Sequence, residues 1–167
     1  MTTDNQTRFT LLPIKPQHDA AMRHIIKTVG AEFGAVGEGF GPSDPEVDAM
    51  SRHYLPENKS LYLVALCDEE VIGGCGIAPF GQDSKVCELK KLFLSEKSRG
   101  LGAGKALTLA CLNFAREQGF ESCYLDTLKS MTAAITMYEK LGFEHLSAPM
   151  AETEHGGCDV WMLKQFG

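Results

Sequence analysis

A short basic and glycine-rich segment, from Arg99 to Lys105, has the residue types and spacing of an anion-binding site. Its three glycines fall within five residues, so a ligand can approach the backbone without meeting a Cβ atom. The helix expected after it begins with N–H groups that lack intrahelical partners, and its dipole adds partial positive charge there. Together these features predict a site for phosphate or pyrophosphate. The residues assigned to this site are Arg99, Gly100, Leu101, Gly102, Ala103, Gly104 and Lys105.

Positive charge is concentrated around this segment although the chain as a whole is acidic. The formal net charge is −6 at pH 7. Between positions 90 and 105 the single acidic residue, Glu96, stands against five basic residues. An anionic ligand is therefore attracted by this local excess and not by the overall field of the protein. The five basic residues are Lys90, Lys91, Lys97, Arg99 and Lys105.

Two common phosphate-binding motifs do not fit the spacing of this segment. A P-loop needs glycine five positions before the Gly-Lys pair and a hydroxyl residue after the lysine, but Arg99 and Ala106 occupy those positions. A dinucleotide fingerprint needs a third glycine at position 105 or 107, where the chain has Lys105 and Leu107. The segment therefore belongs to another class of phosphate site.

Two motifs resemble the GCN5-related N-acetyltransferase family. The first is Arg-Gly-x-Gly-x-Gly preceded by the strand sequence ELKKLFL, which is similar to the acyl-CoA signature of that family. The second is MTAAITMYEKLGF, from Met131 to Phe143, which is similar to the family's closing helix and turn. Their order and separation also agree. The resemblance covers nearly the whole chain and implies acetyl-CoA (coenzyme A) as the cofactor.

The resemblance also assigns cofactor contacts outside the glycine-rich segment. The main-chain groups of Leu92, Phe93 and Leu94 are expected to bind the pantetheine arm as an added strand would. Ala134 and Tyr138 belong to the closing motif, and Tyr138 is expected near the sulfur. Many members of the family have an asparagine where this chain has Met131. The residues that could supply that hydrogen bond instead are Thr127, Ser130 and Thr132.

Acid–base chemistry is assigned to Glu88 and Tyr138. Glu88 lies in a strand otherwise rich in apolar residues, which favours a general base acting directly or through water. Asp126, at the end of the next strand, is the alternative base. The tyrosine is a candidate general acid that hydrogen-bonds to the leaving thiolate. Simpler interpretations remain open, because Glu88 could pair with Lys90 and Tyr138 could be a packed aromatic residue.

The segment from Gly30 to Pro42 is the candidate acceptor-binding loop. It contains five glycines together with Phe33 and Phe40. One interpretation is a plain connector. The resemblance favours a loop whose aromatic residues, with Glu32 or Glu38, shape the acceptor pocket. Phe33, Phe40, Glu88 and Asp126 are therefore the predicted acceptor-binding residues.

Hydrophobic periodicity predicts an α/β fold, a single domain over residues 1–167 with a core from about 8 to 166. The sheet is expected to be mixed and mostly antiparallel, with helices on both faces. The strand–helix–strand unit around the glycine-rich segment predicts one parallel pair. The predicted strands are Arg8–Ile14, Leu61–Cys67, Val71–Phe80, Glu88–Ser95, Ser122–Thr127, Phe143–Ser147 and Asp159–Lys164. The predicted helices are Pro16–Val29, Ser43–Tyr54 with a capping box at Ser43–Glu46, one after the glycine turn, and one ending at Gly142.

Composition narrows the location and partners of the protein. There is no apolar run of the length of a membrane span and no secretory signal at the polar N-terminus, so we expect a cytoplasmic protein. The acidic balance disfavours nucleic acid as a partner. The six cysteines are expected to be reduced, and the five histidines lack ligand-like spacing, so no metal is expected. A monomer or a homodimer is expected.

The sequence thus predicts an enzyme that transfers the acetyl group of acetyl-CoA to a primary amine by direct attack. The acceptor is expected to be a small molecule, an amino acid or a peptide. One alternative is a non-catalytic sensor that binds acyl-CoA without turnover, and another is a nucleotide-binding domain.

Overall fold

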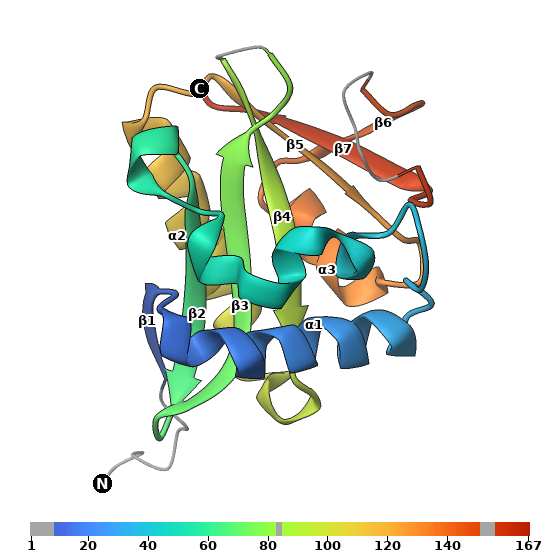
Figure 1. Cartoon of the computed structure of the whole chain (residues 1–167). Coiled ribbons are helices and arrows are strands. Elements are labelled where there is room, and N and C mark those ends of the chain that lie inside the picture. The colour runs from blue at the N-terminus through green and yellow to red at the C-terminus, as the bar shows by residue number, and fades with distance from the viewer. Residues whose placement is uncertain (1–8, 83–84, 151–155) are drawn as a thin grey trace, which may run out of the picture.

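The computed structural model describes residues 9–82, 85–150 and 156–167. One seven-stranded sheet, in the order β1-β2-β3-β4-β5-β7-β6, forms the centre of the molecule (Figure 1). All neighbouring strands are antiparallel except β4 and β5, which confirms the predicted mixed sheet and its parallel pair. The strands are β1 (Thr10–Pro13), β2 (Leu61–Cys67), β3 (Glu70–Pro79), β4 (Val86–Leu94), β5 (Ser122–Thr127), β6 (Glu144–Leu146) and β7 (Val160–Gln165).

Helices cover both faces of this sheet. Helix α1 (Asp19–Glu32) crosses one face, and α2 (Ala103–Glu117) and α3 (Thr132–Lys140) lie on the other (Figure 1). Alternate residues of β2 explain this layering, because successive strand side chains point to opposite faces. Tyr62 and Val64 pack in the cluster that contains α1, whereas Leu63 packs in the cluster that contains α2.

The ends of several predicted elements differ from the structure by one or more residues. Arg8, the predicted start of the first strand, lies outside the described residues. The predicted helix from Pro16 to Val29 begins instead as a 3₁₀ turn, and α1 continues to Glu32. Gly30 is therefore helical, and a Cβ atom there would lie 2.5 Å from the Pro42 side chain. The loop predicted to bind the acceptor therefore starts only at Phe33.

The second predicted helix, from Ser43 to Tyr54, is wrong. The segment consists of 3₁₀ turns, η2 (Gly41–Ser43) and η3 (Pro45–Arg52), with a break at Ala49. Asp44 stands at the N-cap without a side-chain capping bond. Its carboxylate accepts a hydrogen bond from Lys91, and that of Glu46 accepts one from Tyr54. Glu46, the acidic member of the expected capping box, thus uses its side chain for tertiary contacts.

Strands β4 and β5 pair along only part of their length. The recorded pairs run from Val86 with Ser122 to Glu88 with Tyr124, after which β4 continues for six more residues, to Leu94. The register of β4 against β3 also shifts near Lys91, which has a positive φ of 53°. Beyond Glu88 the two strands therefore separate, and the site described below lies at this separation.

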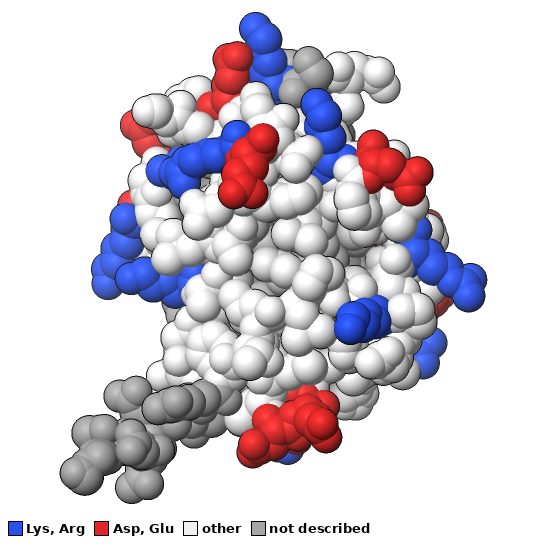
Figure 2. All heavy atoms as spheres, turned by 90° about the vertical axis from the view of Figure 1, so that its left-hand side faces the viewer, with Lys and Arg blue, Asp and Glu red and all other residues white. Residues whose placement is uncertain are grey.

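The charged side chains are mixed on the face that Figure 2 shows, which lies at the left of Figure 1. Blue and red atoms are scattered around a mostly uncharged surface, with no continuous basic area in this view. None of the helices in the described part of the chain has the length and apolar content that a membrane crossing requires.

Candidate active site

The glycine-rich turn has the geometry predicted for it. Gly100 and Gly102 both have a φ of +86°, a region that favours glycine, and Gly102 is the N-cap of α2. A Cβ atom on Gly104 would lie 3.0 Å from Leu94 of the preceding strand. The three glycines thus make the turn and the close packing of helix on strand possible. The first N–H groups of α2, which lack intrahelical partners, lie at this turn.

A pocket of about 300 Å³ lies beside this turn. Phe33 and Met131 line it together with residues from β4, the turn and α3. Four of the predicted cofactor residues do not line it, namely Leu101, Lys105, Thr127 and Tyr138. Those that do are Leu92, Phe93, Leu94, Arg99, Gly100, Gly102, Ala103, Gly104 and Ala134.

A second pocket of about 70 Å³ lies next to the first where β4 and β5 separate. The two pockets share Leu92, Phe93 and Met131 as lining residues. The second pocket brings together most of the residues predicted for acid–base chemistry and acceptor binding. These are Phe40, Glu88, Asp126 and Tyr138, and Thr127, a predicted cofactor residue, lines the pocket as well.

The two carboxylates of this second pocket come from neighbouring strands. Glu88 is the last β4 residue paired with β5 and is only 8% exposed. Asp126 follows two residues after its partner Tyr124 and accepts a hydrogen bond of 3.3 Å from the Tyr124 hydroxyl. The ammonium of Lys90, the alternative partner considered for Glu88, lies 3.6 Å from Glu46.

Tyr138 is both packed and part of the second pocket. It is 5% exposed and its ring lies 5.7 Å from that of Phe143. Burial raises the pKa of the Tyr138 hydroxyl well above its ordinary value of 10. The phenol is therefore neutral at physiological pH, which suits a hydrogen-bond donor.

Comparison with known proteins agrees with this geometry. The model of the acetyltransferase (GNAT) family matches residues 32–143. The uncharacterized N-acetyltransferase YjgM of Escherichia coli (strain K12) is 38% identical over 151 residues, which cover 89% of this chain and 90% of that protein. This chain belongs to the GNAT acetyltransferase family.

Solved structures of the family share the fold along nearly the whole chain. A GNAT acetyltransferase from Staphylococcus aureus Mu50 superposes with a TM-score of 0.81 at 17% identity, over 95% of this chain and 99% of that one. YncA from Salmonella typhimurium, solved with acetyl-CoA, superposes with a TM-score of 0.76 at 17% identity, over 95% and 94%. The GNAT family uses acetyl-CoA, and its members are acetyltransferases.

The GNAT signature arginine, Arg99, is held by a contact that the sequence did not predict. Its guanidinium donates two hydrogen bonds, of 2.7 and 2.8 Å, to Glu32 at the end of α1. It also lies over the ring of Phe33, 5.4 Å from the centroid. The hydrogen bond from Arg99 lowers the pKa of the Glu32 carboxyl. Phe33, predicted to bind the acceptor, thus lies in the larger pocket at the glycine turn.

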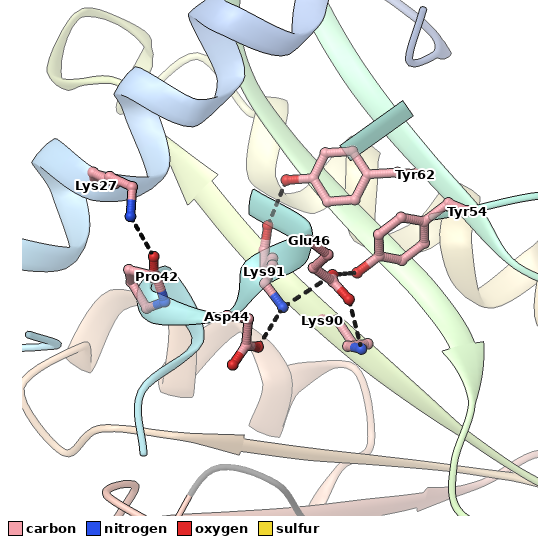
Figure 3. A network of polar contacts seen from close by, with 8 residues as sticks. All are labelled: Lys27, Pro42, Asp44, Glu46, Tyr54, Tyr62, Lys90 and Lys91. Atoms are coloured by element: carbon pink, nitrogen blue, oxygen red, sulfur yellow. Dashed lines mark hydrogen bonds and ion pairs between the residues drawn. The ribbon is translucent and has the colours of Figure 1, made fainter. Parts of the chain in front are cut away.

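A polar network behind the second pocket was also missed (Figure 3). The ammonium of Lys91, whose side chain is 1% exposed, lies 2.8 Å from Asp44 and 3.0 Å from Glu46. Glu46 also accepts the Tyr54 hydroxyl, and the Lys91 carbonyl accepts the Tyr62 hydroxyl at 2.7 Å. The one local sign of this network in the sequence is Lys91 itself, a lysine within a strand rich in apolar residues. Its position does not indicate which carboxylates it binds.

Cys158 is a further pocket residue that the sequence did not single out. It lines the second pocket with Asp126. Burial raises the pKa of the Cys158 thiol to about 12, with Asp126 acting in the same direction. The thiol is thus neutral at physiological pH and is a poor nucleophile. All six cysteines are free, and four of them are buried.

Proposed function

We propose that this enzyme transfers the acetyl group of acetyl-CoA to a primary amine, which is a small molecule, an amino acid or a peptide. The observation that carries the proposal is the contact between the two pockets. The larger pocket ends in a glycine turn suited to a diphosphate, and the smaller one holds two carboxylates and a neutral phenol. Because both share Leu92, Phe93 and Met131, a thioester in the first meets an amine in the second.

The larger pocket fits the donor. The N–H groups at the start of α2 and the guanidinium of Arg99 suit a diphosphate. The end of β4 offers main-chain groups to an extended arm, because β5 has separated from it beyond Glu88. Bound acetyl-CoA supplies the thioester, whose C–S bond breaks as the amine nitrogen forms the new C–N bond.

The smaller pocket fits the acceptor and its proton. We assign Glu88 as the base that takes the amine proton, directly or through water, with Asp126 as the alternative. Tyr138 donates a hydrogen bond to the sulfur as negative charge develops there. The phenol keeps its proton more strongly than an ordinary thiol does, so hydrogen bonding is favoured over complete proton transfer.

The assay that tests this function follows thiol release from acetyl-CoA with a panel of primary amines. Release that depends on an amine is the expected result. Tight binding of coenzyme A without release for any amine would instead support the non-catalytic sensor.

The donor site is tested by Gly102→Asp, which is expected to abolish coenzyme A binding. The new carboxylate would stand at the N-terminus of α2 and repel the diphosphate. Gly119→Asp is the matched control, because Gly119 has a φ of +92°, follows the other end of α2 and, like Gly102, has open space around a Cβ. The control should bind coenzyme A normally, and unchanged affinity in Gly102→Asp would refute the assigned site.

A further inference from the structure

Two loops meet at the mouth of the smaller pocket through a pair of glycines. The Gly157 N–H donates a hydrogen bond of 2.9 Å to the Gly39 carbonyl. The Phe40 ring lies against the Cα of Gly157, since a Cβ there would come within 2.5 to 2.8 Å of three ring atoms. Phe40 and Cys158, which flank this contact, both line the pocket. The contact therefore forms one wall of the acceptor site.

The segment 33–42, which carries Phe40, is fixed from several sides. The main-chain carbonyl of its first residue, Phe33, accepts a hydrogen bond of 2.8 Å from the Ser130 hydroxyl. Its last residue, Pro42, accepts one of 3.0 Å from the Lys27 ammonium (Figure 3). Beyond it, Asp44 is paired with the buried ammonium of Lys91. Moving this segment outward would therefore break its contacts to α1, to β4 and to the residues before α3.

The space that this wall leaves is small. The pocket measures about 70 Å³. For comparison, a closed apolar cavity of about 150 Å³ binds one benzene molecule. Because the Phe40 ring lines this space, we expect an acceptor chain that extends toward it to meet the ring, whereas a compact amine does not reach that far.

We propose that the acceptor is a compact free amine and not a peptide chain, with Phe40, held against Gly157, as the residue that sets this limit. The inference rests on the proposed acetyltransferase function. Of the three acceptor classes proposed above, it keeps small molecules and amino acids and excludes peptides.

The test compares acceptors that share a reacting group and differ in length. Alaninamide and trialaninamide serve as the matched pair, with a series of unbranched primary alkylamines beside them, at saturating acetyl-CoA. The wild-type enzyme is expected to have a kcat/KM at least about tenfold higher for the best compact amine than for trialaninamide. A peptide amide used as well as the best compact amine would overturn the inference.

In Phe40→Ala, the ratio of kcat/KM for the best compact amine to kcat/KM for trialaninamide is expected to fall by about fivefold or more. The substitution removes the ring that blocks a longer acceptor. The KM for acetyl-CoA should stay within about twofold, because Phe40 does not line the donor pocket. Phe33→Ala is the matched control, expected to raise the KM for acetyl-CoA and leave the acceptor preference unchanged. An unchanged preference in Phe40→Ala would contradict the assigned role.

Gly157→Ala provides a second variant should Phe40→Ala fail to fold. Its methyl group must displace the Phe40 ring, so the KM for the acceptor should rise while that for acetyl-CoA does not. An unchanged KM for the acceptor would contradict the proposed role of the contact between Phe40 and Gly157. If no amine of any size is turned over although coenzyme A binds, the proposed function fails, and this inference fails with it.

Discussion

At the scale of single residues, the pair of Arg99 and Glu32 has a direct bearing on cofactor affinity. The carboxylate occupies both arms of the guanidinium that the GNAT signature assigns to the diphosphate. Glu32 is the last residue of α1. The pair could not be predicted because 67 positions separate its members.

Glu32→Gln is therefore expected to tighten coenzyme A binding by about two- to fivefold, because the diphosphate no longer competes with a carboxylate for Arg99. Titration calorimetry measures the effect. Glu70→Gln is the matched control, since it removes the same charge from another exposed ion pair, with Lys97. Weaker binding in Glu32→Gln would show that Glu32 positions Arg99 for the cofactor instead.

Tyr138→Phe is expected to lower kcat by about 10- to 100-fold, the effect of losing a hydrogen bond to a charged group. The dissociation constant of coenzyme A should change much less, because the ring still packs against Phe143. Stopped-flow or steady-state kinetics with a good acceptor separate the two quantities. A wild-type rate would leave Tyr138 with a packing role alone.

At the scale of elements, the 3₁₀ segment η3 is held to β4 by a buried cation. Lys91 comes from the irregular part of β4, and its two carboxylate partners, Asp44 and Glu46, come from the segment that was predicted as a helix. Local sequence favoured a capping box there, but the Glu46 carboxylate pairs with Lys91 instead. The strand that carries Glu88 is thereby fixed to the segment that follows Pro42, a residue that lines the smaller pocket.

Lys91→Met is expected to lower the free energy of unfolding by about 3 kcal/mol, because two carboxylates lose their buried partner. Urea denaturation at neutral pH measures this change. Lys97→Met, which removes a lysine from an exposed pair with Glu70, should cost at most about 0.5 kcal/mol. Similar values for the two variants would contradict the structural role of Lys91.

Glu46 makes this attachment dependent on pH. Burial raises the pKa of its carboxyl, but Lys90, Lys91 and the Tyr54 hydroxyl outweigh burial, so the pKa lies below the ordinary 4.5. A lowered pKa stabilises the fold above pH 4.5, and that contribution is lost as the pH falls through the folded-state pKa. The stability difference between wild type and Glu46→Gln should therefore be full near pH 7 and shrink below pH 4.5. A difference that stays constant down to acid pH would contradict this assignment.

At the scale of the whole molecule, the parts predicted from sequence are those encoded by neighbouring residues. Hydrophobic alternation gave the central strands, and the glycine spacing gave the turn between β4 and α2. The position of Phe33, the pairing of Arg99 and the contact of Phe40 with Gly157 depend on residues far apart in the chain, so no local pattern indicated them.

The central claim is that the N–H groups bared by Gly100, Gly102 and Gly104 hold the diphosphate of coenzyme A. A crystal structure of the complex with acetyl-CoA tests it most directly. The account predicts that diphosphate oxygens lie about 2.7–3.2 Å from these N–H nitrogens. It also predicts that the sulfur lies beside Leu92, Phe93 and Met131, the residues that line both pockets. A cofactor bound elsewhere, with the turn after Arg99 making no contact to phosphate, would contradict it.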